Sequence, residues 1–226
     1  QVNLIEKFVF QKNVLKNNFK NILKKYPNCT KAVLSSVGKL DENDILWLKS
    51  YLNLLEIGHD SVFPFINLYG SPKTLGIDRM VLAAGAVLLY PNQNTLIIDA
   101  GTCVTYDFVT SSNEYLGGAI SPGLRLRYES LHNFTAKLPL LTKKAPENFI
   151  GNTTDEAIHS GVVNGLCNEI EGFVSEYSVK NEQFTIILTG GDANFLANRL
   201  KSTIFADENF LLKGLQQLYT YSLQND

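Results

Sequence analysis

The segment 96–109 holds the residues of this chain whose types and spacing are best suited to chemistry. Two β-type runs meet there at Asp99-Ala100-Gly101-Thr102, a turn that offers a carboxylate, a glycine and a hydroxyl. Glycine lets backbone N–H groups approach a phosphate, Thr102 can donate its hydroxyl, and Asp99 can hold a cation that the phosphates also touch. An Asp-x-Gly sequence is also typical of a plain β-hairpin turn, so this turn alone leaves both interpretations open.

A second glycine-rich turn, Thr189-Gly190-Gly191-Asp192, follows the apolar run 184–188 and precedes a predicted helix. Backbone N–H groups at such a junction point beyond the end of the strand, where an anion or a nucleoside can bind. A tight strand-to-helix connection can have the same sequence. Taken with residues 99–102, the two glycine turns at strand ends predict one shared ligand cleft.

A third candidate is Gly76-Ile77-Asp78-Arg79, which begins an apolar helix after a long loop. An Asp in the first turn of a helix commonly does no more than complement the helix dipole. Because Arg79 follows on a helix with little polar surface, the pair is also suited to a hydroxyl substrate that carries a carboxylate. Asp78 would accept the proton and Arg79 would pair with the carboxylate. His132 is a weaker candidate, since a histidine near a helix end is commonly a surface or C-capping residue.

The elements that must position these residues follow from apolar spacing, which predicts an α/β chain. We expect strands at 4–10, 31–37, 54–57, 95–99, 102–109, 114–120 and 184–188. We expect helices at 14–26, 41–51, 78–90, 123–131, 154–177, 193–201 and 209–223. The turn-rich segment 91–94 marks the boundary of two related lobes, residues 1–93 and 94–226.

Composition excludes several classes of protein. The chain has 226 residues, 45% of them hydrophobic, a net charge of -2 and a pI near 6.0, so it has no basic field for nucleic acid. Its three cysteines lack metal-ligand spacing and are predicted to be reduced core residues. The longest apolar run, 80–90, is too short to span a bilayer, and no signal-like segment is present. We therefore expect a cytoplasmic protein that does not bind membranes.

Seven motifs, taken in order, resemble those of the type III pantothenate kinases. They are Tyr69-x-x-Pro72, Gly76-x-Asp78-Arg79, Asp99-Ala-Gly-Thr102, Gly117-Gly-Ala-Ile-Ser-Pro-Gly123, Thr135-Ala-Lys-Leu-Pro139, Gly151-Asn-Thr-Thr154 and Thr189-Gly-Gly-Asp192. The resemblance covers about residues 60–223. It implies the actin and sugar-kinase superfamily, in which two ribonuclease H-like lobes, with mixed sheets flanked by helices, clasp ATP between them. It also implies a homodimer.

The resemblance implies ATP-dependent phosphorylation of pantothenate to 4'-phosphopantothenate, the first step of coenzyme A biosynthesis, with Asp78 as general base. The residues implied to bind pantothenate are Tyr69, Gly76, Ile77, Asp78, Arg79, His132 and Thr154. Those implied to contact ATP are Gly101, Thr102, Gly190 and Gly191. Asp99 would hold a potassium or ammonium ion, and Mg²⁺ would accompany the phosphates.

One departure from the family pattern concerns its opening strand, which ends in an Asp-x-Gly-Asn-Thr loop that binds phosphates and Mg²⁺. No such loop occurs in this sequence. We expect it to precede Gln1, because a lobe without its first strand would leave an unpaired sheet edge. Two alternatives stay open: a non-catalytic transcriptional accessory factor of the same fold, and a superfamily kinase for another small hydroxy acid. The presence of Asp78, Arg79, Asp99 and Thr102 argues against the accessory factor. Arg79 and Tyr69 favour a substrate that carries a carboxylate without naming it.

Overall fold

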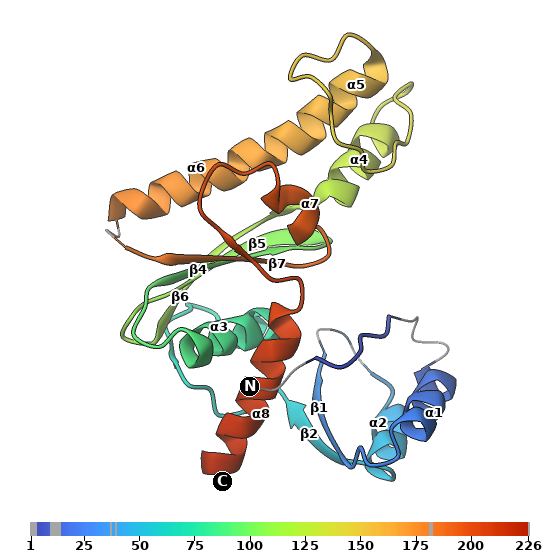
Figure 1. Cartoon of the computed structure of the whole chain (residues 1–226), viewed down its shortest axis with the longest axis vertical. Helices are drawn as coiled ribbons and strands as arrows, with labels where there is room; N and C mark the ends of the chain where they lie inside the picture. The colour runs from blue at the N-terminus through green and yellow to red at the C-terminus, as the bar shows by residue number, and fades with distance from the viewer. Residues whose placement is uncertain (1–3, 10–14, 37, 39, 181–182, 226) are drawn as a thin grey trace. The chain divides into compact units, whose positions relative to one another are not determined.

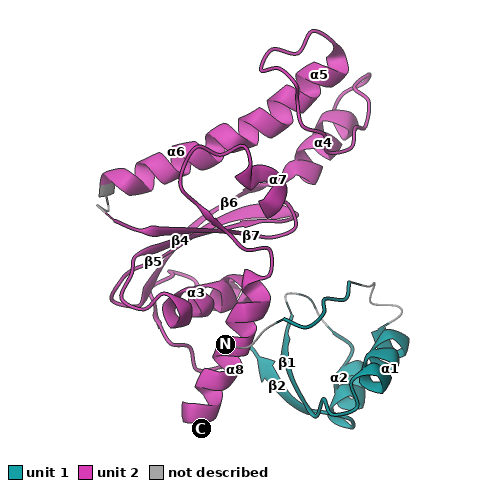
Figure 2. Cartoon of the chain, viewed as in Figure 1, with its two compact units in different colours: residues 1–58 teal, residues 59–226 magenta. Residues whose placement is uncertain are grey.

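The computed structural model describes residues 4–9, 15–36, 38, 40–180 and 183–225 (Figure 1). It is a mixed α/β structure with a six-stranded mixed sheet flanked by helices, which confirms the predicted fold class. The chain divides into two compact units, Gln1–Gly58 and His59–Asp226 (Figure 2). The predicted boundary between two related lobes, at residues 93 and 94, stays a prediction. The division at Gly58 reflects how compactly each part packs, and it does not test whether the two lobes are related.

The first unit contains a short parallel sheet and two helices. Its elements are α1 (Leu15–Lys25), β1 (Lys31–Ser35), α2 (Glu42–Lys49) and β2 (Asn53–Ile57), and β1 pairs with β2 in parallel. Asp41 caps α2 as its sequence predicts, since its side chain accepts a hydrogen bond from the Asn43 backbone N–H. The strand expected at 4–10 is wrong for residues 4–9, which have no regular secondary structure and no strand partner among the described residues. Residue 10 lies outside the described residues.

The second unit is built on a six-stranded sheet with the order β3-β6-β5-β4-β7-β8. The strands are β3 (Ile66–Asn67), β4 (Thr95–Ala100), β5 (Cys103–Val109), β6 (Glu114–Pro122), β7 (Thr185–Thr189) and β8 (Phe205–Ala206). The meander β4-β5-β6 is antiparallel, whereas β4-β7-β8 and β3-β6 pair in parallel. The meander confirms the sequence prediction, but β3 and β8 were missed because a two-residue strand has no detectable alternation.

The helices of this unit cover both faces of the sheet. They are η2 (Pro72–Thr74), α3 (Ile77–Leu89), α4 (Leu124–Asn133), α5 (Thr154–His159), the π-helical turn η3 (Ser160–Asn164), α6 (Gly165–Lys180), α7 (Ala193–Ala197) and α8 (Phe210–Asn225). Figure 1 shows α6 on one side of the sheet and α3 with α8 on the other. No helix among the described residues is long and apolar enough to cross a membrane.

Strand alternation assigns the side chains of β4 and β5 to these two faces. On the face toward α6, Ile98, Val104 and Tyr106 belong to the main hydrophobic core. The intervening residues, Asp99 and Asp107 among them, lie on the face toward α3. Polar groups on two neighbouring strands are therefore directed at the helix that carries Asp78.

Helices α3 and α8 pack through two glycines. A Cβ on Gly85 would lie 2.9 Å from the Gly214 Cα, and one on Gly214 would lie 2.8 Å from the Val81 carbonyl oxygen. These separations are shorter than real Cβ atoms adopt, so both positions require glycine for this approach. The residues of α3 from Val81 to Ala84 are completely inaccessible to solvent, so the helix is firmly anchored against its neighbours.

Candidate active site

The two glycine turns predicted to share a site lie side by side. Strands β4 and β7 are parallel, with Asp99 opposite Thr189, and the Asp192 N–H donates to the Ala100 carbonyl at 3.0 Å. Gly190 adopts a φ of +92°. A Cβ there would overlap the Asp99 carboxylate and come within 2.5 Å of the Ala100 carbonyl oxygen. Glycine is thus required at 190, and the adjacency of the turns is confirmed, while their shared ligand stays a prediction.

The Asp99-to-Thr102 turn is also the hairpin that its sequence allowed. Ala100 and Val104 face each other across the antiparallel pair, and the Gly101 N–H donates to the Cys103 carbonyl at 2.9 Å. The start of α4 supports the turn from behind, because the Gly123 N–H donates to the Thr102 carbonyl at 3.0 Å. Hairpin geometry and a ligand role are therefore compatible here.

Asp99 lies in surroundings that favour a bound cation. Burial, followed by the charges of Asp78 and Asp107, raises the pKa of Asp99 from 3.8 to about 6. A cation beside this carboxylate would offset that repulsion. No group of three His, Cys, Asp or Glu side chains in the described part of the chain could hold a metal ion. A potassium or ammonium ion at Asp99 stays a prediction.

Asp78 and Arg79 lie in the first turn of α3, as predicted. Asp78 is half-buried, and its Oδ1 accepts a hydrogen bond from the Arg79 backbone N–H at 2.8 Å. Arg79 is only 6% exposed. Its Nε and Nη2 donate to Asp107 Oδ1 at 2.9 and 2.6 Å, so its charge is already paired within the protein.

Asp107 and Tyr115 are polar partners that sequence reasoning missed. Asp107 is completely buried, and the Tyr115 hydroxyl donates to its Oδ1 at 2.6 Å. Burial lowers the pKa of Arg79, but the hydrogen bonds and charge of Asp107 outweigh it and hold that pKa above the ordinary value. The available signal was a lone Asp in an apolar strand, on the same face as Asp99 by strand alternation.

Tyr69 lies beside Arg79, and the pantothenate-binding role that the motifs imply for both stays a prediction. The Arg79 guanidinium carbon lies 5.6 Å from the centre of the Tyr69 ring, a cation–π distance. The ring lies against Gly117, whose φ is +97° and where a Cβ would be 2.9 Å from it. Gly117 thus has a structural role, since only glycine fits this backbone conformation beneath the ring.

The structure does not bring the last two pantothenate candidates into this group. His132 Nδ1 lies 2.8 Å from the Leu138 carbonyl oxygen and the side chain is exposed, which matches the alternative of a residue near a helix end. Thr154 begins α5 and is exposed. Among the described residues, no hydrogen bond or ion pair joins either one to Asp78 or Arg79, so their substrate contacts stay predictions.

The cysteine prediction is partly wrong. Cys167 is a buried free thiol as expected, but Cys29 and Cys103 are exposed. Cys103 is the first residue of β5 and directly follows the turn that closes the β4–β5 hairpin. An exposed thiol at the edge of the Asp99 turn could not be inferred from the spacing of the cysteines alone.

Comparison with known proteins decides the family. A sequence model of type III pantothenate kinases matches residues 8–176. The chain belongs to the type III pantothenate kinase family. A type III pantothenate kinase of Flavobacterium johnsoniae is 57% identical over 99% of this chain and 91% of its own length. One of Flavobacterium psychrophilum is 55% identical over 96% of this chain and 90% of its own length.

One solved structure shares the fold of this chain, although its sequence is less similar than those of the two Flavobacterium kinases. The Campylobacter jejuni protein described as a Baf family transcriptional activator superposes with a TM-score of 0.59 and 22% identity, over 86% of this chain and 84% of its own. At that identity the likeness concerns the fold alone. The resemblance read from the ordered motifs is thereby confirmed at the level of the family, while the role of each motif residue stays a prediction.

Proposed function

We propose that this chain transfers the γ-phosphoryl group of ATP to the terminal hydroxyl of pantothenate, with Asp78 receiving the hydroxyl proton. Family membership makes it a pantothenate kinase, a phosphotransferase of coenzyme A biosynthesis. The observation that carries the residue assignment is the placement of Asp99 on the face of β4 toward α3, the helix whose first turn holds Asp78. Burial, and then the charge of Asp78, raises the pKa of Asp99 to about 6, which supports this proximity. An acceptor site and a phosphate site would then adjoin.

The pantothenate side of the site starts at the beginning of α3. Asp78 is the acid–base group, and Arg79 attracts the carboxylate of pantothenate through the N–H groups that Asp107 does not use. Tyr69 covers one face of the guanidinium. Residues Gly76, Ile77, His132 and Thr154 complete the proposed pocket. Here Asp78 acts on the hydroxyl end of the substrate and Arg79 on its acidic end.

The ATP side consists of the two adjoining glycine turns. Backbone N–H groups of Gly190 and Gly191, with the Thr102 hydroxyl, would contact the nucleotide. Gly101, whose N–H already donates to the Cys103 carbonyl, would let the nucleotide approach the turn closely because it has no side chain. Asp99 would hold potassium or ammonium beside the phosphates. Mg²⁺ would be bound chiefly by the phosphates, as Mg²⁺ commonly is, and when bound it neutralises phosphate charge.

Catalysis in this arrangement is mainly a matter of positioning. Phosphoryl transfer requires the attacking and leaving oxygens to be in line, and little covalent chemistry falls to the protein. Asp78 orients the hydroxyl at least as much as it removes its proton. The firm anchoring of α3 serves this role, because an Asp in the first turn of a buried helix has little freedom to move.

We also propose a cytoplasmic homodimer that binds neither nucleic acid nor membrane. The resemblance supports the dimer. The acidic pI of about 6.0 supports the absence of direct nucleic-acid contact. The transcriptional alternative gains no support from the Campylobacter jejuni structure, because 22% identity shows the fold alone.

The direct test is a coupled ADP-release assay of the purified full-length protein, including any residues encoded before Gln1, with ATP, Mg²⁺, potassium and pantothenate. We expect ADP release that requires pantothenate and product that has gained one phosphoryl group by mass spectrometry. Release of ADP with another small hydroxy acid and none with pantothenate would favour the other superfamily kinase. No release with either would contradict the proposal.

A further inference from the structure

Two buried side chains on the α3 face of the sheet have no part in the proposed chemistry. Asp107 lies on β5 and Tyr115 on β6, and both are completely buried. Asp107 accepts hydrogen bonds from Arg79, and Tyr115 donates one to Asp107. A buried carboxylate requires strong partners. The hydrogen bonds that Asp107 accepts therefore indicate its role in the structure.

Three donors converge on one oxygen of Asp107. Arg79 Nε, Arg79 Nη2 and the Tyr115 hydroxyl all donate to Oδ1, at 2.9, 2.6 and 2.6 Å. The other oxygen, Oδ2, is buried and has no hydrogen-bond partner among the described residues. The most favourable arginine–carboxylate pair uses two parallel hydrogen bonds to two oxygens. This pair therefore uses one carboxylate oxygen where that geometry uses two, and the Thr105 side chain also interacts with Asp107.

The consequence is a guanidinium whose plane is fixed by Asp107, with Tyr69 as a further side-chain hydrogen-bond partner. A guanidinium has five N–H donors, and two of them meet Asp107. Tyr69 lies over one face of the group. The remaining N–H groups keep one orientation, as a subsite that binds a carboxylate by geometry requires.

We propose that Asp107 and Tyr115 are positioning residues for pantothenate, which hold Arg79 so that its remaining N–H groups meet the substrate carboxylate. The inference rests on the proposed function, specifically on Arg79 as the carboxylate-binding group. Arg79 follows Asp78 directly, so the same contact also keeps the first turn of α3 against β5. Neither Asp107 nor Tyr115 contacts the reacting atoms.

The test compares two buried tyrosines, each of which donates a hydrogen bond to a carboxylate. The partner of Tyr115 is Asp107, which holds Arg79, whereas the partner of Tyr106 is Glu169, which does not contact Arg79. Tyr115→Phe removes the hydroxyl that meets Asp107, and Tyr106→Phe removes one that meets Glu169 at 2.8 Å. Both tyrosines are completely buried, and the Tyr106 ring belongs to the opposite, α6-side core. We expect Tyr115→Phe to raise the KM for pantothenate by roughly threefold to tenfold, the range of one hydrogen bond, with the KM for ATP unchanged. Tyr106→Phe should change neither KM.

Asp107→Asn extends the test to the charge. We expect a KM for pantothenate raised by about tenfold or more, a smaller change in kcat, and an unchanged KM for ATP. In an Arg79→Gln background, Asp107→Asn should add no further increase, because its effect passes through Arg79. If Asp107→Asn does not fold, as judged by circular dichroism, the Tyr115 and Tyr106 pair decides the question.

The outcomes separate this inference from the proposed function. A wild-type chain that does not phosphorylate pantothenate overturns the proposed function. An active wild-type chain whose Tyr115→Phe variant loses thermal stability like Tyr106→Phe, with both KM values unchanged, overturns the positioning role alone. Equal increases in the KM for pantothenate and for ATP would also overturn it, since they would indicate general damage to the site.

Discussion

Asp78 is the residue on which the proposed chemistry depends most directly. Replacing it with Asn keeps its size and removes its ability to accept a proton. We expect Asp78→Asn to lower kcat by on the order of 100-fold or more, the usual effect of losing a general base. Steady-state kinetics with pantothenate measures this.

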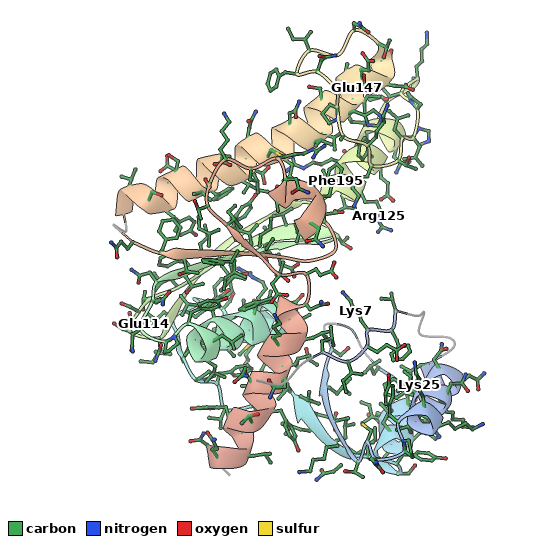
Figure 3. All side chains as sticks on the ribbon, in the orientation of Figure 1. Lys7, Lys25, Glu114, Arg125, Glu147 and Phe195 are labelled. Atoms are coloured by element: carbon green, nitrogen blue, oxygen red, sulfur yellow. The ribbon has the colours of Figure 1, made fainter. Side chains whose placement is uncertain are left out.

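The matched control for this substitution is Glu147→Gln, which also removes one negative charge. Glu147 lies beside α5 in Figure 3, with a side chain that is 78% exposed. The kcat of the Glu147→Gln variant should equal that of the wild-type chain. Near-normal turnover of Asp78→Asn would rule out the proton-accepting role.

Asp99 leads to a prediction about ions. Replacing potassium and ammonium with a large organic cation should raise the KM for ATP, because the phosphates would then face an uncompensated carboxylate. Asp99→Asn should make activity insensitive to the same exchange. The measurement is the KM for ATP at constant ionic strength, and a wild-type chain indifferent to these ions would contradict the assignment.

Single residues also show the limit of sequence reasoning. Asp78, Arg79 and Asp99 stood out because each occurs in a short motif with neighbours of matching chemistry. Asp107 was missed, since its partner Arg79 is 28 residues away and only the register of β5 under α3 joins them. Contacts between distant segments depend on packing, which one sequence does not show.

At the scale of elements, Glu169 on α6 connects three elements, because it accepts hydrogen bonds from Tyr106 on β5 and Arg127 on α4. These contacts give a prediction about the pH dependence of stability. Burial raises the pKa of Glu169, but hydrogen bonds from Arg127, Ser121 and Tyr106 outweigh it and leave that pKa below 4.5. Because the pKa of Glu169 is lower in the folded state, these hydrogen bonds contribute fully to the free energy of unfolding above about pH 4.5. That contribution is lost as the pH falls through the pKa of Glu169 in the folded protein.

Glu169→Gln should therefore reduce stability at pH 7 by about 1–3 kcal/mol, the range for hydrogen bonds to a charged group. It should also flatten the fall of the melting temperature below pH 4.5. Thermal unfolding between pH 3 and pH 7 measures both effects. Glu176→Gln, on the exposed side of the same helix, is the control, and identical pH profiles for the two variants would refute the prediction.

The α3–α8 contact gives a second prediction at this scale. Gly214→Ala would place a Cβ 2.8 Å from the Val81 carbonyl oxygen, so the helices must separate at a cost of about 1–3 kcal/mol. A lower melting temperature is the expected result. Gly172→Ala is the matched control on α6, because a Cβ there meets nothing within 4 Å, and it should be neutral or stabilising by up to about 1 kcal/mol. Equal effects of the two substitutions would argue against the close contact.

Most elements could be predicted where apolar residues repeat over a sufficient length. The meander and α3 lie within a few residues of their expected positions, whereas β3 and β8 are too short to carry a period. The strand expected at 4–10 alternates correctly, but residues 4–9 remain irregular. Alternation shows that a segment can form a strand, and a partner is still needed to form one.

At the scale of the whole molecule, the homodimer is the prediction that sequence supports least directly. Four apolar side chains of α4–α5 connecting residues are exposed by more than half: Phe134, Leu140, Phe149 and Ile150. Exposed apolar groups of this kind are commonly covered by a partner. Sedimentation velocity should give about 50 kDa, twice the 25.2 kDa of one chain. A single species of one chain's mass at micromolar concentration would contradict the dimer.

The pairing of Gly85 with Gly214 also bears on how the protein is made. Helix α3 leaves the ribosome well before residues 210–225 have been translated, roughly ten seconds at ordinary elongation rates. During that interval its apolar face has no α8 to cover it. The helix that begins with Asp78 and Arg79 is thus synthesised early, but its apolar face is covered only when α8 has been made. We expect this face to be a binding site for chaperones on nascent chains.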